Sequence, residues 1–168
     1  MDLTDRELKL KLRLAQIEKN EACRKNFLTF VKSMWPDFIT GRHHKIIADK
    51  FQRVASGELK RLIINMAPRH TKSEFASFLF PAWMMGNNPR MKIIQATHTT
   101  ELAVNFGRKT KNLIDTDEYK EVFPDVKLAS DSKASGRWDT ASGGMYYAVG
   151  VGSNLAGRGG DLVIIDDP

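Results

Sequence analysis

The sequence is poor in cysteine and lacks a long apolar run, and both shortages limit what the protein can be. Cys23 is the only cysteine among 168 residues, which excludes an internal disulfide and fits a reducing cytoplasm. The longest apolar stretch, residues 75–85, is interrupted by Pro81 and is too short to span a bilayer. The charged N-terminus has no secretion signal. We therefore expect an ordinary globular protein in the cytoplasm, without a membrane partner.

Positive charge is in moderate excess, with a net charge of +6 and a pI near 9.5. This balance tolerates a polyanionic partner such as DNA but does not require one. The basic residues are spread along the chain rather than gathered in an arm or tail. A hydrophobic content of 42% and the length of the chain suit one domain with a substantial core.

The first part of the chain predicts a long helix over residues 4–34. Thr4 and Glu7 form a capping box, in which each side chain satisfies a backbone N–H of the first turn. Pro36 is expected to stop the helix. Residues 1–36 are thus predicted to be an N-terminal helix that packs on the domain, with an extended arm as the alternative.

From residue 37 onward, apolar runs alternate with helical patterns. Strands buried on both faces are expected at residues 61–66, 92–96 and 162–165, helices at 43–54, 72–85 and 99–114, and a hairpin around Trp138 and residues 145–149. This alternation predicts an α/β domain over residues 37–168, with a mostly parallel sheet and helices on both faces.

The order strand, loop, Lys72-Ser73, helix is typical of a phosphate site. A bound phosphate needs backbone N–H donors, a helix N-terminus and a cation held together. Lys72 is expected to reach the β- and γ-phosphates of a nucleotide, and the Ser73 hydroxyl to bind Mg²⁺. The usual pattern, G-x-x-x-x-G-K-[ST], has glycines where this chain has Met66 and Thr71. An ordinary turn with a solvated lysine is the alternative.

Two carboxylates follow the last apolar run. Asp166 and Asp167 come directly after residues 162–165, and ligands of open α/β sheets bind at the carboxyl ends of strands. Asp166 is expected to hold Mg²⁺ through water, and Asp167 to polarise an attacking water molecule. A simple helix cap would also explain the pair.

With these motifs in view, the chain resembles the large terminase subunits of tailed phages over residues 35–168. The most specific stretches are residues 67–74, 95–103 and 150–168. The phosphate loop of that family often lacks glycines and carries an early arginine, which Arg69 matches. Many members have Asp-Glu where this chain has Asp166-Asp167, and the shorter side chain of Asp167 requires a slightly different position for the attacking water.

The resemblance implies an ASCE-type P-loop NTPase that hydrolyses ATP with Mg²⁺. It also implies translocation of double-stranded DNA by a homo-oligomeric ring on the portal protein, with a terminase small subunit, in the bacterial host cytoplasm. The sequence ends at Pro168, directly after the second acidic motif. The coupling motif, the last strands of the sheet and a C-terminal nuclease domain are therefore expected to be missing from it.

Candidate site residues follow from the same reading. The nucleotide-binding loop is predicted to comprise Ala67, Pro68, Arg69, His70, Thr71, Lys72, Ser73 and Glu74. Phe38 and the pair His43-His44 are candidates for adenine contact, although a packed, capped helix start explains them almost as well. Arg158, flanked by glycines, is a candidate arginine finger acting on a neighbour in a ring, and Arg69 is its rival within the chain. A loop arginine that contacts solvent or DNA is the alternative for Arg158.

Two other functions stay open at this level. One is a different DNA-tracking P-loop ATPase, such as a superfamily 2 helicase, although no Asp-Glu-x-His box follows the last strand. The other is a module that binds nucleotide without turnover.

Overall fold

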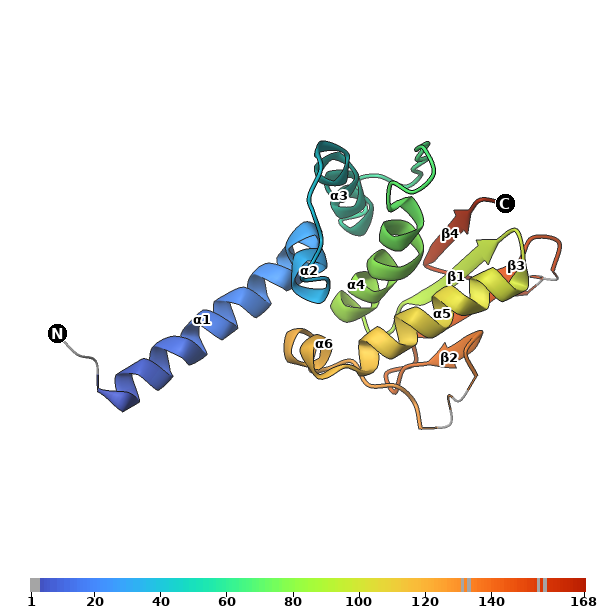
Figure 1. The fold of residues 1–168 in the computed structure, drawn as a ribbon. Helices are drawn as coiled ribbons and strands as arrows, with labels where there is room; N and C mark the ends of the chain where they lie inside the picture. Colours follow the sequence, from blue (N-terminus) through green and yellow to red (C-terminus); the bar gives the residue numbers. More distant parts are fainter. Residues whose placement is uncertain (1–3, 131, 133, 154, 156) are drawn as a thin grey trace.

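The structure is a computed structural model that describes residues 4–130, 132, 134–153, 155 and 157–168. It is an α/β fold in which helices pack on a mixed four-stranded sheet (Figure 1). The elements in chain order are α1 (Asp5–Lys25), α2 (Phe27–Met34), α3 (Arg42–Ala55), the π-helix η1 (Glu74–Leu79), α4 (Phe80–Asn87), β1 (Lys92–Thr97), α5 (Thr100–Asp115), α6 (Asp117–Val122), β2 (Arg137–Asp139), β3 (Met145–Gly150) and β4 (Leu162–Asp166). None of the described helices combines the length and apolarity that crossing a membrane requires.

The sheet has the order β2-β3-β1-β4. β1 pairs in parallel with both β3 and β4, whereas β2 and β3 form the antiparallel hairpin expected from the sequence. The predicted strands at residues 92–96 and 162–165 are present, and the mostly parallel arrangement is confirmed. Thr97 lies opposite Asp166 in the register, so the carboxyl ends of β1 and β4 meet at one edge of the sheet.

The strand predicted at residues 61–66 is wrong. This segment forms no strand, and Ile63 is 87% exposed. An apolar run becomes a buried strand only when a neighbouring strand takes up its backbone hydrogen bonds. Among the described residues β4 pairs only with β1, and the segment instead rests partly against the core through Leu62, Ile64 and Met66.

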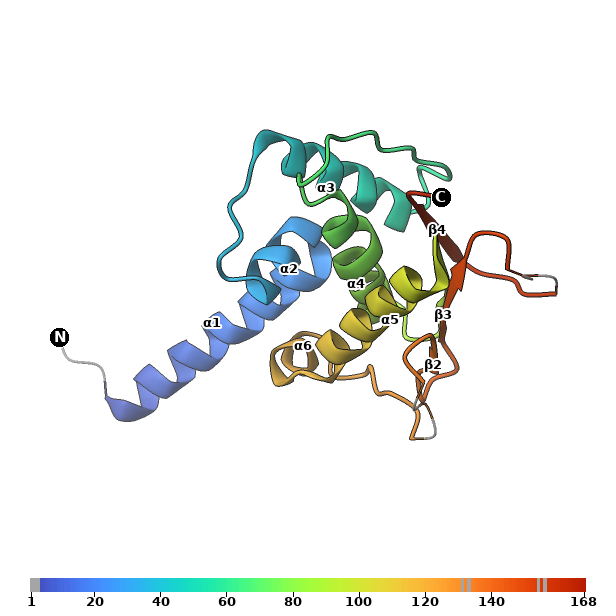
Figure 2. The same ribbon diagram turned by 45° about the vertical axis from the view of Figure 1, so that its right-hand side comes forward.

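The prediction of helices on both faces of the sheet is also wrong for the described residues. The helices lie on one side of the sheet, as Figure 2 shows. On the opposite face, the segment before β4 places Gly160 against Ile94. Val163 and Ile165 on that face remain 55% and 63% exposed, so β4 is not buried on both sides.

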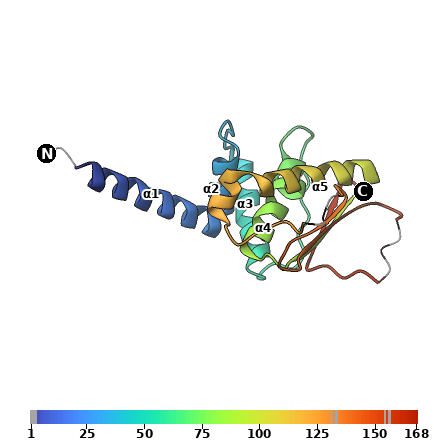
Figure 3. The same cartoon turned by 90° about the horizontal axis from the view of Figure 1, so that it is seen from below.

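The predicted helix at residues 4–34 is divided at Asn26, where α1 ends and α2 begins. The Thr4–Glu7 capping box is present, and α2 ends at Met34, just before Pro36. The first turns of α1 project from the body of the molecule (Figure 3), whereas Phe27 in α2 is fully buried. The core therefore continues across the boundary expected at residues 36 and 37.

Aromatic side chains from four helices meet at the centre of this core. Phe27 makes edge-to-face contacts with Phe51, Phe75 and Phe80, each at a ring-centroid distance of 5.5 to 5.6 Å. Such contacts add to the free energy of burying the rings. Because Phe75 lies near the start of the helix that follows residues 67–73, this packing holds the beginning of that helix in place.

Candidate nucleotide site

A cavity of about 450 Å³ lies where the loop after residue 66 meets the end of β4. It is lined by Met66, Ala67, Pro68, Arg69, His70, Thr71, Lys72, Ser73, Glu74 and Asp167. All eight residues of the predicted nucleotide-binding loop are in this set. A loop and a strand end that are about ninety residues apart in sequence thus form one site.

The ammonium group of Lys72 is the positive centre of this site. It forms a hydrogen-bonded ion pair with Asp167 and lies 3.5 Å from Oδ1 of Asp166. Hydrogen bonding to Asp167, reinforced by the charge of Asp166, raises the pKa of Lys72 above its ordinary value. The lysine is therefore fully charged at neutral pH.

The backbone of the loop is left-handed at two positions without glycine. Arg69 and Thr71 have φ values of 63° and 62°, and Thr71 stands where the usual phosphate-loop pattern has its second glycine. A β-branched residue is rarely found in this region because its Cβ crowds the following carbonyl. The glycine-like turn is thus present at Thr71 without the glycine.

His44, which the sequence proposed together with His43 for adenine contact, holds Thr71 in place. Nδ1 of His44 accepts a hydrogen bond from the N–H of Gly41 at 2.8 Å, so the ring proton lies on Nε2. Nε2 then donates to Oγ1 of Thr71 at 2.6 Å, and the Thr71 hydroxyl donates to the carbonyl of His70. Burial lowers the pKa of His44, which keeps the ring in the neutral form that this arrangement needs.

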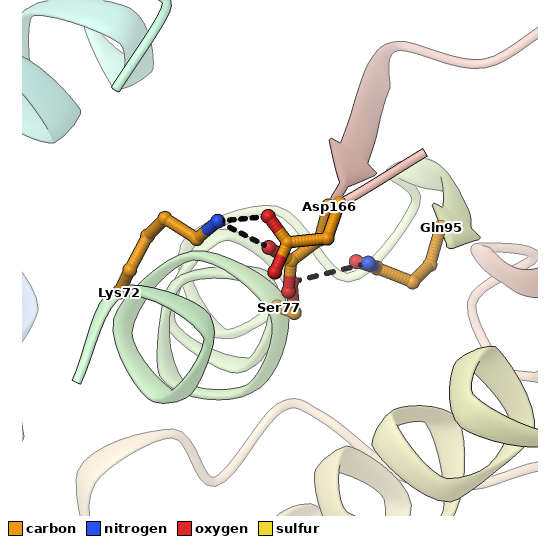
Figure 4. A network of polar contacts seen from close by, with 5 residues as sticks. Lys72, Ser77, Gln95 and Asp166 are labelled. Carbon is orange, nitrogen blue, oxygen red and sulfur yellow. Dashed lines mark hydrogen bonds and ion pairs between the residues drawn. The ribbon is translucent and has the colours of Figure 1, made fainter. Parts of the chain in front are cut away.

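Asp166 is buried beneath the cavity and is held by two further residues that the sequence analysis missed. Ser77 donates a hydrogen bond to Oδ2 of Asp166 at 2.8 Å, and Gln95 donates to the Ser77 hydroxyl at 3.1 Å (Figure 4). Ser73, the predicted partner of Asp166 at the metal, lies one helical turn earlier and lines the cavity. A helical repeat from Ser73 to Ser77 is the one sequence signal that would have suggested this contact.

Three other predicted residues lie outside the cavity. Phe38 packs between Trp35, His44 and Phe75, as in a packed helix start, and its contact with adenine stays a prediction. His43 lines another, mainly apolar cavity of about 350 Å³ between α3 and residues 62–66. The Arg158 guanidinium stacks on the ring of Tyr147 at 4.2 Å, so the structure does not bring it to Lys72.

The described residues contain no group of three or more His, Cys, Asp or Glu side chains arranged to hold a metal ion. Of the two predicted metal ligands, Ser73 lines the cavity and Asp166 lies 3.5 Å from Lys72, which also lines it. Comparisons with protein-family models, with curated proteins and with solved structures gave no match. The site must therefore be interpreted from its own geometry.

Proposed function

We propose that this chain is the ATP-hydrolysing motor domain of a phage DNA-packaging terminase, with an ASCE-type P-loop NTPase fold. The observation that carries the proposal is that Lys72 and Asp167 line one cavity and that Lys72 also lies 3.5 Å from the buried Asp166. A cation from the loop before a helix and two carboxylates from a strand end are the groups that a metal-bound triphosphate requires.

The residues present fit a triphosphate in three respects. The left-handed backbone at Thr71 turns the chain as a phosphate loop requires, and the following helix presents its N-terminus to the cavity. Lys72 is charged and already paired with carboxylates. A phosphate oxygen would replace Asp167 as its partner, which exchanges one charge-assisted hydrogen bond for another.

Ser73 and Asp166 fit Mg²⁺ as two oxygen donors among several. Mg²⁺ favours octahedral oxygen coordination and keeps much of its water, so two side chains suffice when phosphates complete the shell. When bound, Mg²⁺ supplies positive charge that stabilises the phosphoryl group during transfer. Asp166 holds its position through contacts below the cavity, whereas Ser73 lies at its wall.

The remaining charged side chains have different roles in the proposed hydrolysis. Asp167 is exposed and lies beside Lys72, so its carboxylate is free to orient water once Lys72 turns to phosphate. Arg69 lines the cavity and provides the arginine within the chain. Arg158 lies away from this cavity and would act only on the site of a neighbouring subunit in a ring.

The proposal for DNA packaging rests on the resemblance of residues 67–74, 95–103 and 150–168 to large terminase subunits. With it come double-stranded DNA, the portal protein and the terminase small subunit as proposed partners. A helicase with the same core chemistry would separate DNA strands. A module that only binds nucleotide would show affinity without turnover.

The test measures ATP binding by calorimetry and ATP hydrolysis with and without double-stranded DNA. Lys72→Ala removes the cation and is expected to weaken Mg²⁺-ATP binding roughly 10- to 100-fold. Asp167→Asn keeps the shape of the side chain but cannot orient water as a base. It is expected to retain or improve binding, because it competes less for Lys72, while turnover falls by about two orders of magnitude or more.

Lys127→Ala is the matched control, since Lys127 is an exposed lysine outside the cavity, and it is expected to leave both measurements unchanged. Absence of ATP binding by the wild-type chain would overturn the proposal. Binding without hydrolysis under either condition would favour the nucleotide-binding module, and ATP-dependent strand separation would favour the helicase.

A further inference from the structure

A line of buried polar contacts runs from the interior of the sheet to the candidate site. Gln95 on β1 and Ser77 on η1 are fully buried, and Asp166 at the end of β4 is 5% exposed. Gln95 contacts Ser77, Ser77 contacts Asp166, and Asp166 lies beside Lys72, as Figure 4 shows. Buried polar groups lower stability unless they are paired, and each of these residues is paired with the next one in the line.

The hydrogen bonds in this line run in one direction, from Gln95 to Ser77 and from Ser77 to Asp166. The Gln95 amide nitrogen donates to Ser77, so the single hydroxyl proton of Ser77 is available for Oδ2 of Asp166. With the amide reversed, the Gln95 oxygen and the carboxylate would compete for that proton. The Gln95 Oε1 atom has no partner within the described residues, which is the cost of this orientation.

The two oxygens of Asp166 are consequently unequal. Oδ2 is directed into the core by the Ser77 hydroxyl, whereas Oδ1 faces Lys72 at 3.5 Å. A carboxylate restrained in this way has only Oδ1 left for a ligand that binds beside Lys72 at the cavity wall. It cannot rotate to chelate with both oxygens without breaking the bond to Ser77.

We propose that Ser77 and Gln95 are positioning residues that make Asp166 a one-oxygen donor and thereby favour Mg²⁺ over Ca²⁺ at this site. The inference rests on the proposed function and deepens it. Mg²⁺ is small, octahedral and commonly takes single oxygens from one or two carboxylates, whereas Ca²⁺ accepts bidentate carboxylates in a larger, more flexible shell. Neither Ser77 nor Gln95 touches the metal or the nucleotide.

The experiment titrates Mg²⁺ and, separately, Ca²⁺ into the chain with ATP and measures ATP binding by calorimetry. Ser77→Ala is expected to raise the Mg²⁺ concentration for half-maximal binding roughly tenfold, the lower end of what a lost outer-shell partner costs. The Ca²⁺ midpoint is expected to change less, so the preference for Mg²⁺ falls. ATP binding in EDTA, which depends on Lys72 and the loop but not on the metal, is expected to stay the same.

Gln95→Met tests the second link, because it fills a similar volume without donating to Ser77. It is expected to raise the Mg²⁺ concentration for half-maximal binding, as Ser77→Ala does. Added to Ser77→Ala, it is expected to cause no further rise. Thr110→Val is the matched control, since it removes another fully buried hydroxyl, one that bonds to the Phe78 carbonyl on η1 and not to Ser77 or Asp166. It is expected to leave both midpoints unchanged.

The outcomes separate this inference from the proposed function. If the wild-type chain binds Mg²⁺-ATP but Ser77→Ala and Gln95→Met keep its Mg²⁺ and Ca²⁺ midpoints, the positioning role is wrong and the proposed function stands. If the wild-type chain binds no ATP, the proposed function fails and this inference fails with it. Equal shifts in Thr110→Val would also overturn the inference, because they would report a general loss of core packing.

Discussion

Left-handed backbone at residues other than glycine is concentrated around one cavity. Arg69, Thr71 and Asp167 are the described non-glycine residues with positive φ, and all three line it. Each left-handed residue with a Cβ costs about 1 to 2 kcal/mol. Such strain persists only where surrounding contacts impose it, and it is common at functional sites.

Arg69 allows this strain to be measured, because its side chain is exposed and it has φ of 63°. Arg69→Gly is expected to be more stable than Arg69→Ala, with a free energy of unfolding that is higher by about 0.5 to 1 kcal/mol. Both variants lose the same guanidinium, so the difference reports the backbone. Urea unfolding at equilibrium measures it, and equal stabilities of the two variants would contradict the left-handed conformation.

His44 links the stability of the fold to pH. Burial, with smaller effects of His43 and His70, lowers the pKa of His44 below its ordinary value of 6.5. The unfolded chain therefore binds this proton more readily than the folded chain. The stability that neutral His44 contributes is complete above pH 6.5 and is lost as the pH falls through the folded-state pKa.

His44→Gln is accordingly expected to reduce the pH dependence of the unfolding free energy below pH 6.5. Urea unfolding of the variant and the wild type, between neutral pH and about pH 5, measures the slope. His98→Gln serves as the control because His98 is exposed. If His44→Gln keeps the wild-type dependence of the unfolding free energy on pH, other titrating groups are responsible for that dependence.

At the scale of elements, the division of the predicted N-terminal helix has a specific cause. The Asn26 side chain accepts a hydrogen bond from the N–H of Thr29 and caps α2, and its amide donates to Gln52 on α3 at 3.0 Å. A new helix thus begins at Asn26, with Phe27 directed into the core. The continuous helical pattern could not reveal this, because the contact with Gln52 and the burial of Phe27 involve residues distant in sequence.

Asn26→Ala is expected to lower the free energy of unfolding by about 1 to 2 kcal/mol, the usual cost of a lost cap. Thr4→Ala removes the cap of α1 at the exposed, projecting end of that helix and is expected to cost only about 0.5 kcal/mol. Thermal and urea unfolding compare the two. Equal costs would mean that the Asn26 cap and its contact with Gln52 contribute little to the core.

At the scale of the whole molecule, the face of the sheet opposite the helices is open near β4. Val163 and Ile165 are more than half exposed there, whereas Ile94 on the same face is 4% exposed beneath the segment that contains Gly160. β4 is also an edge strand within the described residues. An exposed apolar edge is a site of self-association.

Val163→Thr combined with Ile165→Thr is therefore expected to reduce concentration-dependent light scattering of the chain. The free energy of unfolding should change by less than about 0.5 kcal/mol per site, because both side chains are largely exposed. Ile94→Val is the contrasting change on the same face. It should cost about 0.5 to 1.5 kcal/mol because that side chain is buried, and it should leave the scattering as it is in the wild type.

Local chemistry was sufficient to predict several features from the sequence. The capping box at Thr4, the helix end before Pro36 and the strands at residues 92–96 and 162–165 depend on periodicity and turn residues within a few positions. The same holds for Lys72-Ser73 after a loop and for Asp166 at a strand end. All eight predicted loop residues line the cavity for this reason.

Tertiary contacts decided the rest. Residues 61–66 are as apolar as a buried strand, but no described strand pairs with them. One face of β4 is likewise exposed because no described element packs on Val163 and Ile165. The bonds from His44 to Thr71 and from Ser77 to Asp166 join residues 27 and 89 positions apart. A sequence pattern reports which groups a segment can offer, but hydrogen bonding and burial depend on the neighbours that the folded chain brings to it.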